Sequence, residues 1–137
     1  MTENNLLIKE NIKYIIIHCS DTEDSDTAAD IHQLHLSFGW DGIGYHKIIQ
    51  RDGKVENGRP EYWIGAHARG YNTKSLGVCL IGKKKFTKNQ FNSLEKIIRL
   101  WKSCYNNPKI IGHNLISDTN KTCPNFDVEQ WCRIKNL

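Results

Sequence analysis

Two histidines and one cysteine stand where strands or turns of this chain are expected to end. His18 follows the apolar run 15–17, His113 follows residues 110–112, and Cys123 lies ten residues after His113. Ligands of α/β sheets bind at the carboxyl ends of the strands, so these three side chains could meet in one crevice. Two imidazoles and a thiolate suit zinc and leave one coordination position for water or substrate. The spacing is compatible with a catalytic zinc site.

Other residues of the same types leave alternatives open. His32 and His35 lie three residues apart on a predicted helix and could share a metal ion, or one packs while the other is solvated. Cys19 directly follows His18, and side chains alternate along a strand, so we expect Cys19 to point to the opposite face. By spacing alone, a histidine at a strand end is also compatible with a purely structural role.

Short apolar segments predict the strands that would position these residues. Residues 13–18 centre on three consecutive isoleucines, which is typical of an interior strand covered on both faces. Residues 76–81 form a second segment of this kind. Residues 44–50 predict a strand followed by a hairpin turn at 51–54, and a short strand is expected at 110–111.

Capping signals and periodic apolar residues predict three helices. The first begins near Asp26 or Thr27, and the third is capped by Asp127. The second begins at a capping box formed by Thr87 and Gln90. Their expected apolar faces are, in order, Ile31, Leu34, His35 and Phe38; Phe91, Leu94, Ile97, Ile98 and Trp101; and Val128, Trp131 and Ile134.

Strands and helices alternate along the chain, which predicts an α/β fold. We expect a single domain over residues 1–137, with a mixed, mostly parallel central sheet and helices on both of its faces. The core would extend from about residue 13 to residue 134, with residues 1–12 as an N-terminal extension. The length of 137 residues is usual for one compact domain.

The composition is that of an ordinary soluble protein, with 39% apolar and 25% charged residues and a formal net charge of +4. The longest basic run, 83–85, is too short for a dedicated nucleic-acid patch, and no apolar stretch approaches transmembrane length. The five scattered cysteines include no CxxC pair, and no export signal is visible at the N-terminus. We therefore expect reduced thiols, cytoplasmic synthesis, and neither a nucleic acid nor a membrane among the partners.

Between about Tyr14 and Trp131 the chain contains a series of short motifs in a specific order and spacing. They are Ile17-His18-Cys19-Ser20, Gly39-Trp40, Gly44-Tyr45-His46, Arg51-Asp52-Gly53, Gly58-Arg59, Gly65-Ala66-His67-Ala68-Arg69-Gly70-Tyr71-Asn72, Ser75-Leu76-Gly77-Val78, Gly112-His113 and Lys121-Thr122-Cys123-Pro124. Together they resemble the zinc-dependent N-acetylmuramoyl-L-alanine amidases of the type 2 family. Within it the chain is most similar to small phage lysozymes of the amidase type, and more distantly similar to animal peptidoglycan-recognition proteins.

The resemblance implies a specific reaction and a role for each matching residue. It makes His18, His113 and Cys123 the ligands of one Zn²⁺, and it makes peptidoglycan the substrate. The bond cut is the amide between the lactyl group of N-acetylmuramic acid and L-alanine. Lys121 matches a lysine placed to stabilise the tetrahedral oxyanion. Tyr45 matches a tyrosine that hydrogen-bonds the zinc water or assists proton transfer.

The resemblance also implies weaker assignments. His67 matches a position that lines the cleft, where it would contact substrate or a zinc ligand. Residues expected to contact the glycan or the peptide are Trp40, Arg59, Asn72 and Thr119. No HExxH motif is present, so the general base is not assigned to a glutamate. Asn125 replaces the glycine that many family members have after Cys-Pro, and asparagine tolerates left-handed backbone conformations.

Other functions remain open within this resemblance. One is the cytosolic amidase that recycles anhydro-muropeptides, in which the third ligand is typically aspartate, so that Cys123 favours the phage-like branch. Another is a binding module that does not cut peptidoglycan; such relatives usually lack the cysteine. Some small phage amidases also restrain the phage RNA polymerase. We expect a monomeric phage or prophage endolysin that waits in the cytoplasm and reaches the wall through a membrane pore or on lysis.

Overall fold

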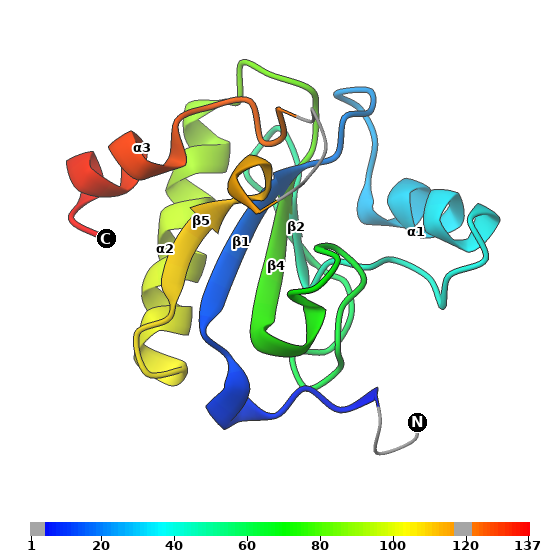
Figure 1. Ribbon diagram of the computed structural model, residues 1–137. Helices are drawn as coiled ribbons and strands as arrows, with labels where there is room; N and C mark the ends of the chain where they lie inside the picture. The colour runs from blue at the N-terminus through cyan, green and yellow to red at the C-terminus, as the bar shows by residue number, and fades with distance from the viewer. Residues whose placement is uncertain (1–4, 117–121) are drawn as a thin grey trace.

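The computed structural model describes residues 5–116 and 122–137. Within them one five-stranded sheet has the order β3-β2-β4-β1-β5 (Figure 1). The strands are β1 (Tyr14–Cys19), β2 (Lys47–Ile49), β3 (Val55–Asn57), β4 (Ser75–Leu80) and β5 (Lys109–Gly112). β1 pairs in parallel with β4 and β5, β4 pairs in parallel with β2, and the edge strand β3 is antiparallel to β2. The predicted mixed, mostly parallel sheet is confirmed.

The described residues also form three α-helices: α1 (Ala28–Ser37), α2 (Lys88–Cys104) and α3 (Val128–Lys135). Short 3-10 turns are η2 (Lys9–Asn11), η3 (Asn72–Lys74) and η4 (His113–Leu115). Figure 1 shows α2 and α3 on one side of the sheet and α1 on the other. Helices therefore cover both faces, as the alternation of elements predicts.

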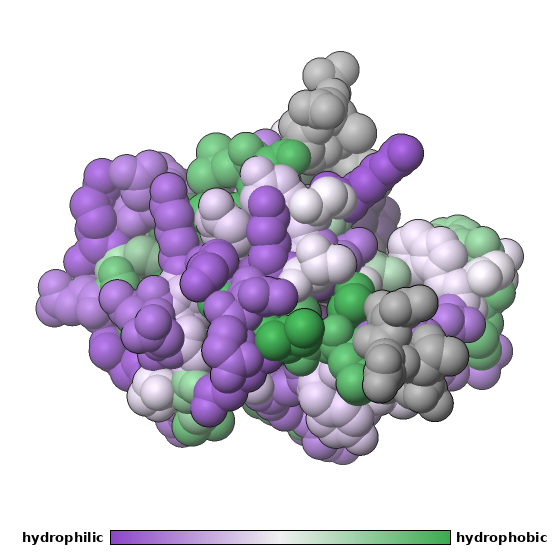
Figure 2. All heavy atoms as spheres, turned by 60° about the horizontal axis from the view of Figure 1, so that its bottom comes forward, coloured by the Kyte–Doolittle hydropathy of each residue, from purple (hydrophilic) through white to green (hydrophobic). Residues whose placement is uncertain are grey.

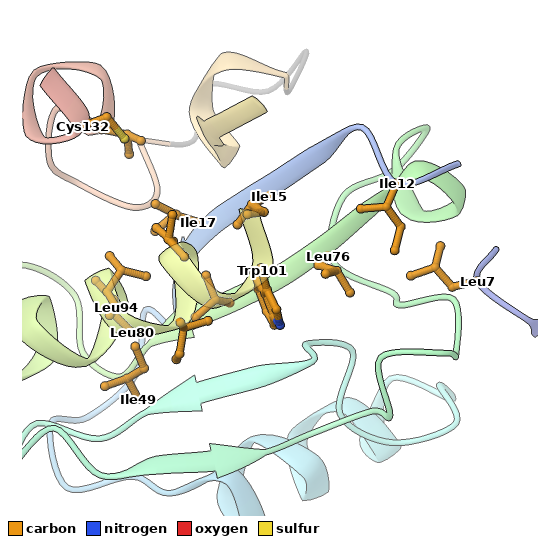
Figure 3. Close-up of a cluster of buried hydrophobic side chains, with 14 residues drawn as sticks. Leu7, Ile12, Ile15, Ile17, Ile49, Leu76, Leu80, Leu94, Trp101 and Cys132 are labelled. Carbon is orange, nitrogen blue, oxygen red and sulfur yellow. The ribbon is translucent and has the colours of Figure 1, made fainter. Parts of the chain in front are cut away.

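Alternation along β1 divides its side chains between the two faces. Ile15 and Ile17 pack with Leu94 and Trp101 of α2 in the main core cluster (Figure 3). Ile16 belongs to a separate cluster on the other face. His18 follows the same alternation as Ile16, so its side chain points to the face that α1 covers. The main core therefore supports the strand, and the opposite face carries its histidine.

Helix α2 is tied to the sheet by its first turn. The predicted capping box is present, because Thr87 accepts a hydrogen bond from the Gln90 backbone and the Gln90 side chain accepts one from the Thr87 backbone. The buried Gln90 amide also donates to the carbonyl oxygens of Ile49 and Ile81, at 3.1 and 3.0 Å. One side chain thus satisfies backbone groups at the helix start and at the ends of two strands.

The first and last helices are more exposed than their apolar periodicity predicts. Leu34 and Phe38 of the α1 region are 40% and 56% exposed, and Ile134 of α3 is 68% exposed. The buried side chains of α1 are instead Ala28, Ile31 and His35. A short surface helix buries only a narrow stripe of its side chains, so Leu34 and Phe38 remain at the surface.

Two boundaries also differ from the prediction. Strand β2 covers only residues 47–49, and before it the Gly44 carbonyl oxygen accepts the N–H of Ala66 at 3.0 Å from the loop at 65–67. The core begins before residue 13, since Leu7 and Ile12 belong to the main cluster. The segment leading into η2 leaves Leu6 and Ile8 exposed. Figure 2, in which the bottom of Figure 1 is turned toward the viewer, shows small hydrophobic areas within a largely hydrophilic surface.

Candidate metal centre and active site

Three potential metal-binding side chains converge at the carboxyl ends of β1 and β5. His18 lies near the end of β1, His113 begins the turn that follows β5, and Cys123 lies in the segment before α3. Their candidate donor atoms all lie within 4.8 Å of one another. The parallel pairing of β1 with β5 brings the first two together, and their ring centroids are 4.5 Å apart. Among the described residues this is the one cluster that could hold a metal ion.

Cys123 is held against the end of β1 by backbone hydrogen bonds. Its Sγ accepts the N–H of Cys19 at 2.9 Å, and its carbonyl oxygen accepts the N–H of Asn114 at 2.8 Å. Hydrogen bonding to the Cys19 side chain and burial both raise the pKa of the Cys123 thiol. The charge of a bound cation would favour the thiolate form of Cys123.

The turn after Cys123 contains Asn125 in place of glycine, and this residue contacts Cys19. Asn125 adopts a left-handed conformation with φ 65°, which asparagine tolerates, so the expected turn is present. Its amide donates to the Cys19 sulfur at 3.7 Å. Cys19 follows His18, and strand alternation directs it to the other face, yet at the end of the strand it still contacts this turn. Cys19 and Cys123 therefore both line the groove at the candidate centre.

His67 contacts His18 from the loop before β4. Nδ1 of His67 lies 2.9 Å from Nε2 of His18, across 49 positions of sequence. Burial lowers the pKa of His67 well below its usual value, so the ring is neutral. The Asn72 side chain accepts the backbone N–H groups of His67 and Ala68, at 3.0 and 2.9 Å, and so holds this loop.

Tyr45 forms part of the wall beside His18. The two ring centroids are 5.1 Å apart. Burial, with a smaller contribution from the neighbouring Cys79, raises the pKa of Tyr45 well above 10, so its hydroxyl remains a proton donor at neutral pH. Its backbone carbonyl accepts the N–H of Arg59 at 2.8 Å, which fixes the chain on either side of the ring.

The two histidines of α1 hold a loop through their Nδ1 atoms. Nδ1 of His32 accepts the N–H of Ile43 at 3.0 Å, and Nδ1 of His35 accepts the N–H of Gly44 at 2.9 Å. These bonds position the residues that lead into Tyr45. Each imidazole thus uses Nδ1 to hold the loop, and neither histidine belongs to the cluster of His18, His113 and Cys123.

A groove of about 900 Å³ opens above these residues. Its α1 wall consists of Leu34, His35, Phe38 and Trp40, and its other side includes Ala66, His67, Ala68, Arg69 and Asn72. The rings of Trp40 and Phe38 contact each other with centroids 5.3 Å apart. Leu34 and Phe38 were expected in the core; their helical spacing identified the face, but only the packing shows that this face borders a groove.

The predicted substrate contacts divide into three groups. Trp40, His67 and Asn72 line the groove. Arg59 does not; it lines a neighbouring pocket and donates to the carbonyl oxygens of Ile43 and Ile64, both at 2.9 Å. Its role as a substrate contact is therefore unsupported by its position. Lys121 and Thr119 lie outside the described residues.

Comparison with known proteins identifies the family. The profile of the N-acetylmuramoyl-L-alanine amidases matches residues 8–126, which is most of the chain. The chain belongs to this amidase family. The amidase is 39% identical to the endolysin of Escherichia phage T7 over 133 residues, which cover 90% of this chain and 87% of the relative. It is an enzyme of the phage-endolysin type within that family.

Solved structures show that the fold is shared as well. The amidase superimposes with a TM-score of 0.85 on the N-acetylmuramoyl-L-alanine amidase LysC from Clostridium intestinale, at 30% identity and covering 94% of this chain and 88% of that one. It also matches PGRP-SA of the bumblebee with a TM-score of 0.83 and 32% identity, covering 94% and 84% of the two chains. In the described part of the amidase, no helix has the length and apolar character needed to cross a membrane.

Proposed function

We propose that this amidase is a zinc-dependent endolysin that cleaves peptidoglycan between the N-acetylmuramic acid lactyl group and L-alanine. The observation that carries the proposal is the cluster of His18, His113 and Cys123, with donor atoms within 4.8 Å of one another at the floor of an open groove. The reaction belongs to the family, and the endolysin of phage T7 supports its use in lysis. The enzyme would act on the wall after release from the cytoplasm.

The donor set fits zinc by its chemistry. Two imidazole nitrogens and one thiolate are borderline-soft ligands that zinc accepts, and three protein ligands leave a position for the reaction. The backbone N–H of Cys19 at the Cys123 sulfur supports the thiolate form. When bound, the ion activates water and polarises the scissile carbonyl.

Tyr45 and Lys121 are the residues that we propose act on the reacting groups. The raised pKa of Tyr45 keeps its hydroxyl protonated, so it can donate a hydrogen bond to the attacking water or to the developing oxyanion. We propose that Lys121 stabilises the oxyanion. Lys121→Ala is then expected to keep its zinc and lose turnover by about 10²-fold in kcat, whereas Lys84→Ala, an exposed lysine of another loop, is the matched control.

The groove offers surfaces suited to a glycopeptide. Trp40 and Phe38 present partly exposed rings on which the apolar faces of sugar rings can pack. The opposite side offers polar groups at Arg69 and Asn72. We propose that the glycan lies along the α1 wall and that the scissile amide approaches the donor cluster between the two sides.

Digestion of purified cell walls tests the proposal. The amidase is incubated with intact sacculi with and without a chelator, and the products are analysed for new L-alanine N-termini and new reducing sugar ends. We expect new L-alanine N-termini, their loss with chelator, and recovery with added zinc. New reducing ends in place of them would mean glycosidase activity and would contradict the proposal.

The recycling amidase is the alternative reaction of the same family. It would prefer soluble anhydro-muropeptides to intact sacculi, so the two substrates are compared at equal concentrations of scissile bonds. We expect the sacculi to be cut efficiently, since the groove is open on the surface and can admit a polymer. Activity confined to the soluble fragments would favour recycling.

A further inference from the structure

We propose that His67 is a positioning residue that holds His18 in its Nε2–H tautomer and so presents Nδ1 of His18 to the metal. The inference rests on the proposed zinc site and adds to it the ring nitrogen that His18 uses and the residues that select it. It concerns a chain of hydrogen bonds from the centre into the interior: His18, His67, Ser75 and the backbone of Tyr71.

The donor and acceptor in each of these hydrogen bonds can be derived from the innermost pair, Ser75 and Tyr71. The Ser75 hydroxyl lies 2.7 Å from the Tyr71 carbonyl oxygen, and a carbonyl can only accept, so the hydroxyl donates its single proton there. Nε2 of His67 lies 3.4 Å from the Ser75 oxygen, which then has only its lone pairs to offer. His67 therefore carries its proton on Nε2 and donates it toward Ser75.

That tautomer of His67 determines the state of His18. A neutral imidazole carries one proton, so Nδ1 of His67 is an acceptor. Nε2 of His18, 2.9 Å away, must donate to it. The lone pair that His18 offers to a metal is then on Nδ1. A ligand histidine whose second nitrogen donates to a fixed acceptor is restricted in both tautomer and ring orientation, which raises metal affinity.

The surroundings of His67 are shaped to keep its ring in one place. A Cβ added at Gly65 would lie 2.6 Å from the His67 ring, and a Cβ added at Gly77 would lie 2.7 Å from it. Two glycines thus leave the space that the imidazole fills. Asn72 fixes the backbone of His67, and the side chain is almost fully buried. This is the arrangement expected for a ring with a directional role, since rotation would meet backbone on either side.

Two substitutions of His67 separate the hydrogen bond from the packing. In His67→Asn the side-chain oxygen can occupy the place of Nδ1 and accept from His18. In His67→Gln the longer side chain reaches toward Ser75 and removes the acceptor next to His18. We expect His67→Gln to raise the zinc dissociation constant by about 10- to 100-fold, measured by competition with a chromophoric chelator, and His67→Asn to change it far less. Equal losses in both variants would indicate packing alone and would overturn the proposal.

Imidazole nitrogen NMR provides a readout that needs neither zinc nor activity. Long-range ¹⁵N–¹H correlations of the metal-free amidase are expected to show His18 and His67 both protonated at Nε2. In Ser75→Ala, which removes the inner acceptor, His67 should lose its single tautomer while the fold is retained. A proton on Nδ1 of His67 in the wild type would overturn the proposal. Failure of zinc to bind would contradict the proposed function. The tautomers of His18 and His67, measured in the metal-free amidase, would still test the present proposal.

Discussion

Cys123 brings the single anionic donor to the candidate centre and is held there by the backbone of Cys19. Its role differs from that of the other described cysteines. Cys79 and Cys132 are buried among apolar residues, and Cys104 is exposed at the end of α2. Cys19 also lines the groove, but among the described cysteines only Cys123 offers a donor atom to the cluster with His18 and His113.

We expect Cys123→Ala to lose both bound zinc and amidase activity, because two imidazoles alone make a weak zinc site. Metal content by atomic emission should fall from about one zinc per chain to near zero. Cys104→Ala is the matched control, since the same atoms are removed from an exposed position far from the cluster. Retention of zinc by Cys123→Ala would contradict the assignment of this ligand.

Helix α1 is the element for which the sequence-based prediction and the structure differ most. Its two histidines accept backbone N–H groups from the loop that carries Tyr45, and its exposed apolar residues form a groove wall. The helix therefore both lines the groove and positions the loop that leads to Tyr45.

Phe38→Ala is expected to weaken substrate binding without weakening the fold. The ring is 56% exposed and lines the groove, so its loss removes apolar contact with substrate and costs the core little. KM for soluble wall fragments should rise by about three- to tenfold with kcat nearly unchanged. Leu36→Ala is the control, because Leu36 is exposed on the same helix but does not line the groove. The idea fails if both variants shift KM equally.

Gln90 at the start of α2 should matter for stability and not for chemistry. Gln90→Leu leaves the carbonyl oxygens of Ile49 and Ile81 without their donor and removes half of the capping box. We expect a loss of about 2 to 4 kcal/mol in the free energy of unfolding, measured with urea. Asn89→Leu, at the exposed neighbouring position, is the control. An equal effect of both would show that the buried amide is not responsible.

At the scale of the whole molecule, several buried neutral histidines cover the face of the sheet opposite α2. His46 is the clearest case. Its Nδ1 accepts the N–H of Gly77 at 3.0 Å, and its Nε2 lies 2.8 Å from the Trp63 carbonyl oxygen, where it donates. Burial lowers the pKa of His46 from 6.5 to about 4. The interior therefore resists protonation of this ring.

This pKa predicts how stability depends on pH. The folded-state pKa of His46 lies below its value in the unfolded chain, so the stabilisation is present above pH 6.5 and is lost as the pH falls through about 4. The contribution amounts to about 3 kcal/mol for the metal-free amidase. Urea unfolding between pH 7.5 and about pH 4 measures it. His46→Gln, which cannot titrate, should show a shallower decline; parallel curves for the two proteins would contradict the prediction.

Much of the architecture was predictable because it is encoded locally. The isoleucine run before His18 predicts β1, the Thr87–Gln90 box predicts the start of α2, and Asp127 predicts the start of α3. The placement of His18 and His113 at strand ends was predictable for the same reason, since a parallel sheet gathers its carboxyl ends at one edge. Local periodicity failed at Leu34 and Phe38, because an apolar stripe has the same spacing whether it faces a core or a groove.

Sequence by itself determined the family, through the order of its short motifs, and the resemblance named three candidate donor residues, which the structure brings together. Only the tertiary structure decided that His67 contacts His18, that Arg59 serves the backbone of a neighbouring pocket, and that His32 and His35 hold a loop. The physical reason is that such contacts depend on strand order and register, which bring together residues many positions apart. The His18–His67 bond exists because β1 and β4 are neighbours in the sheet.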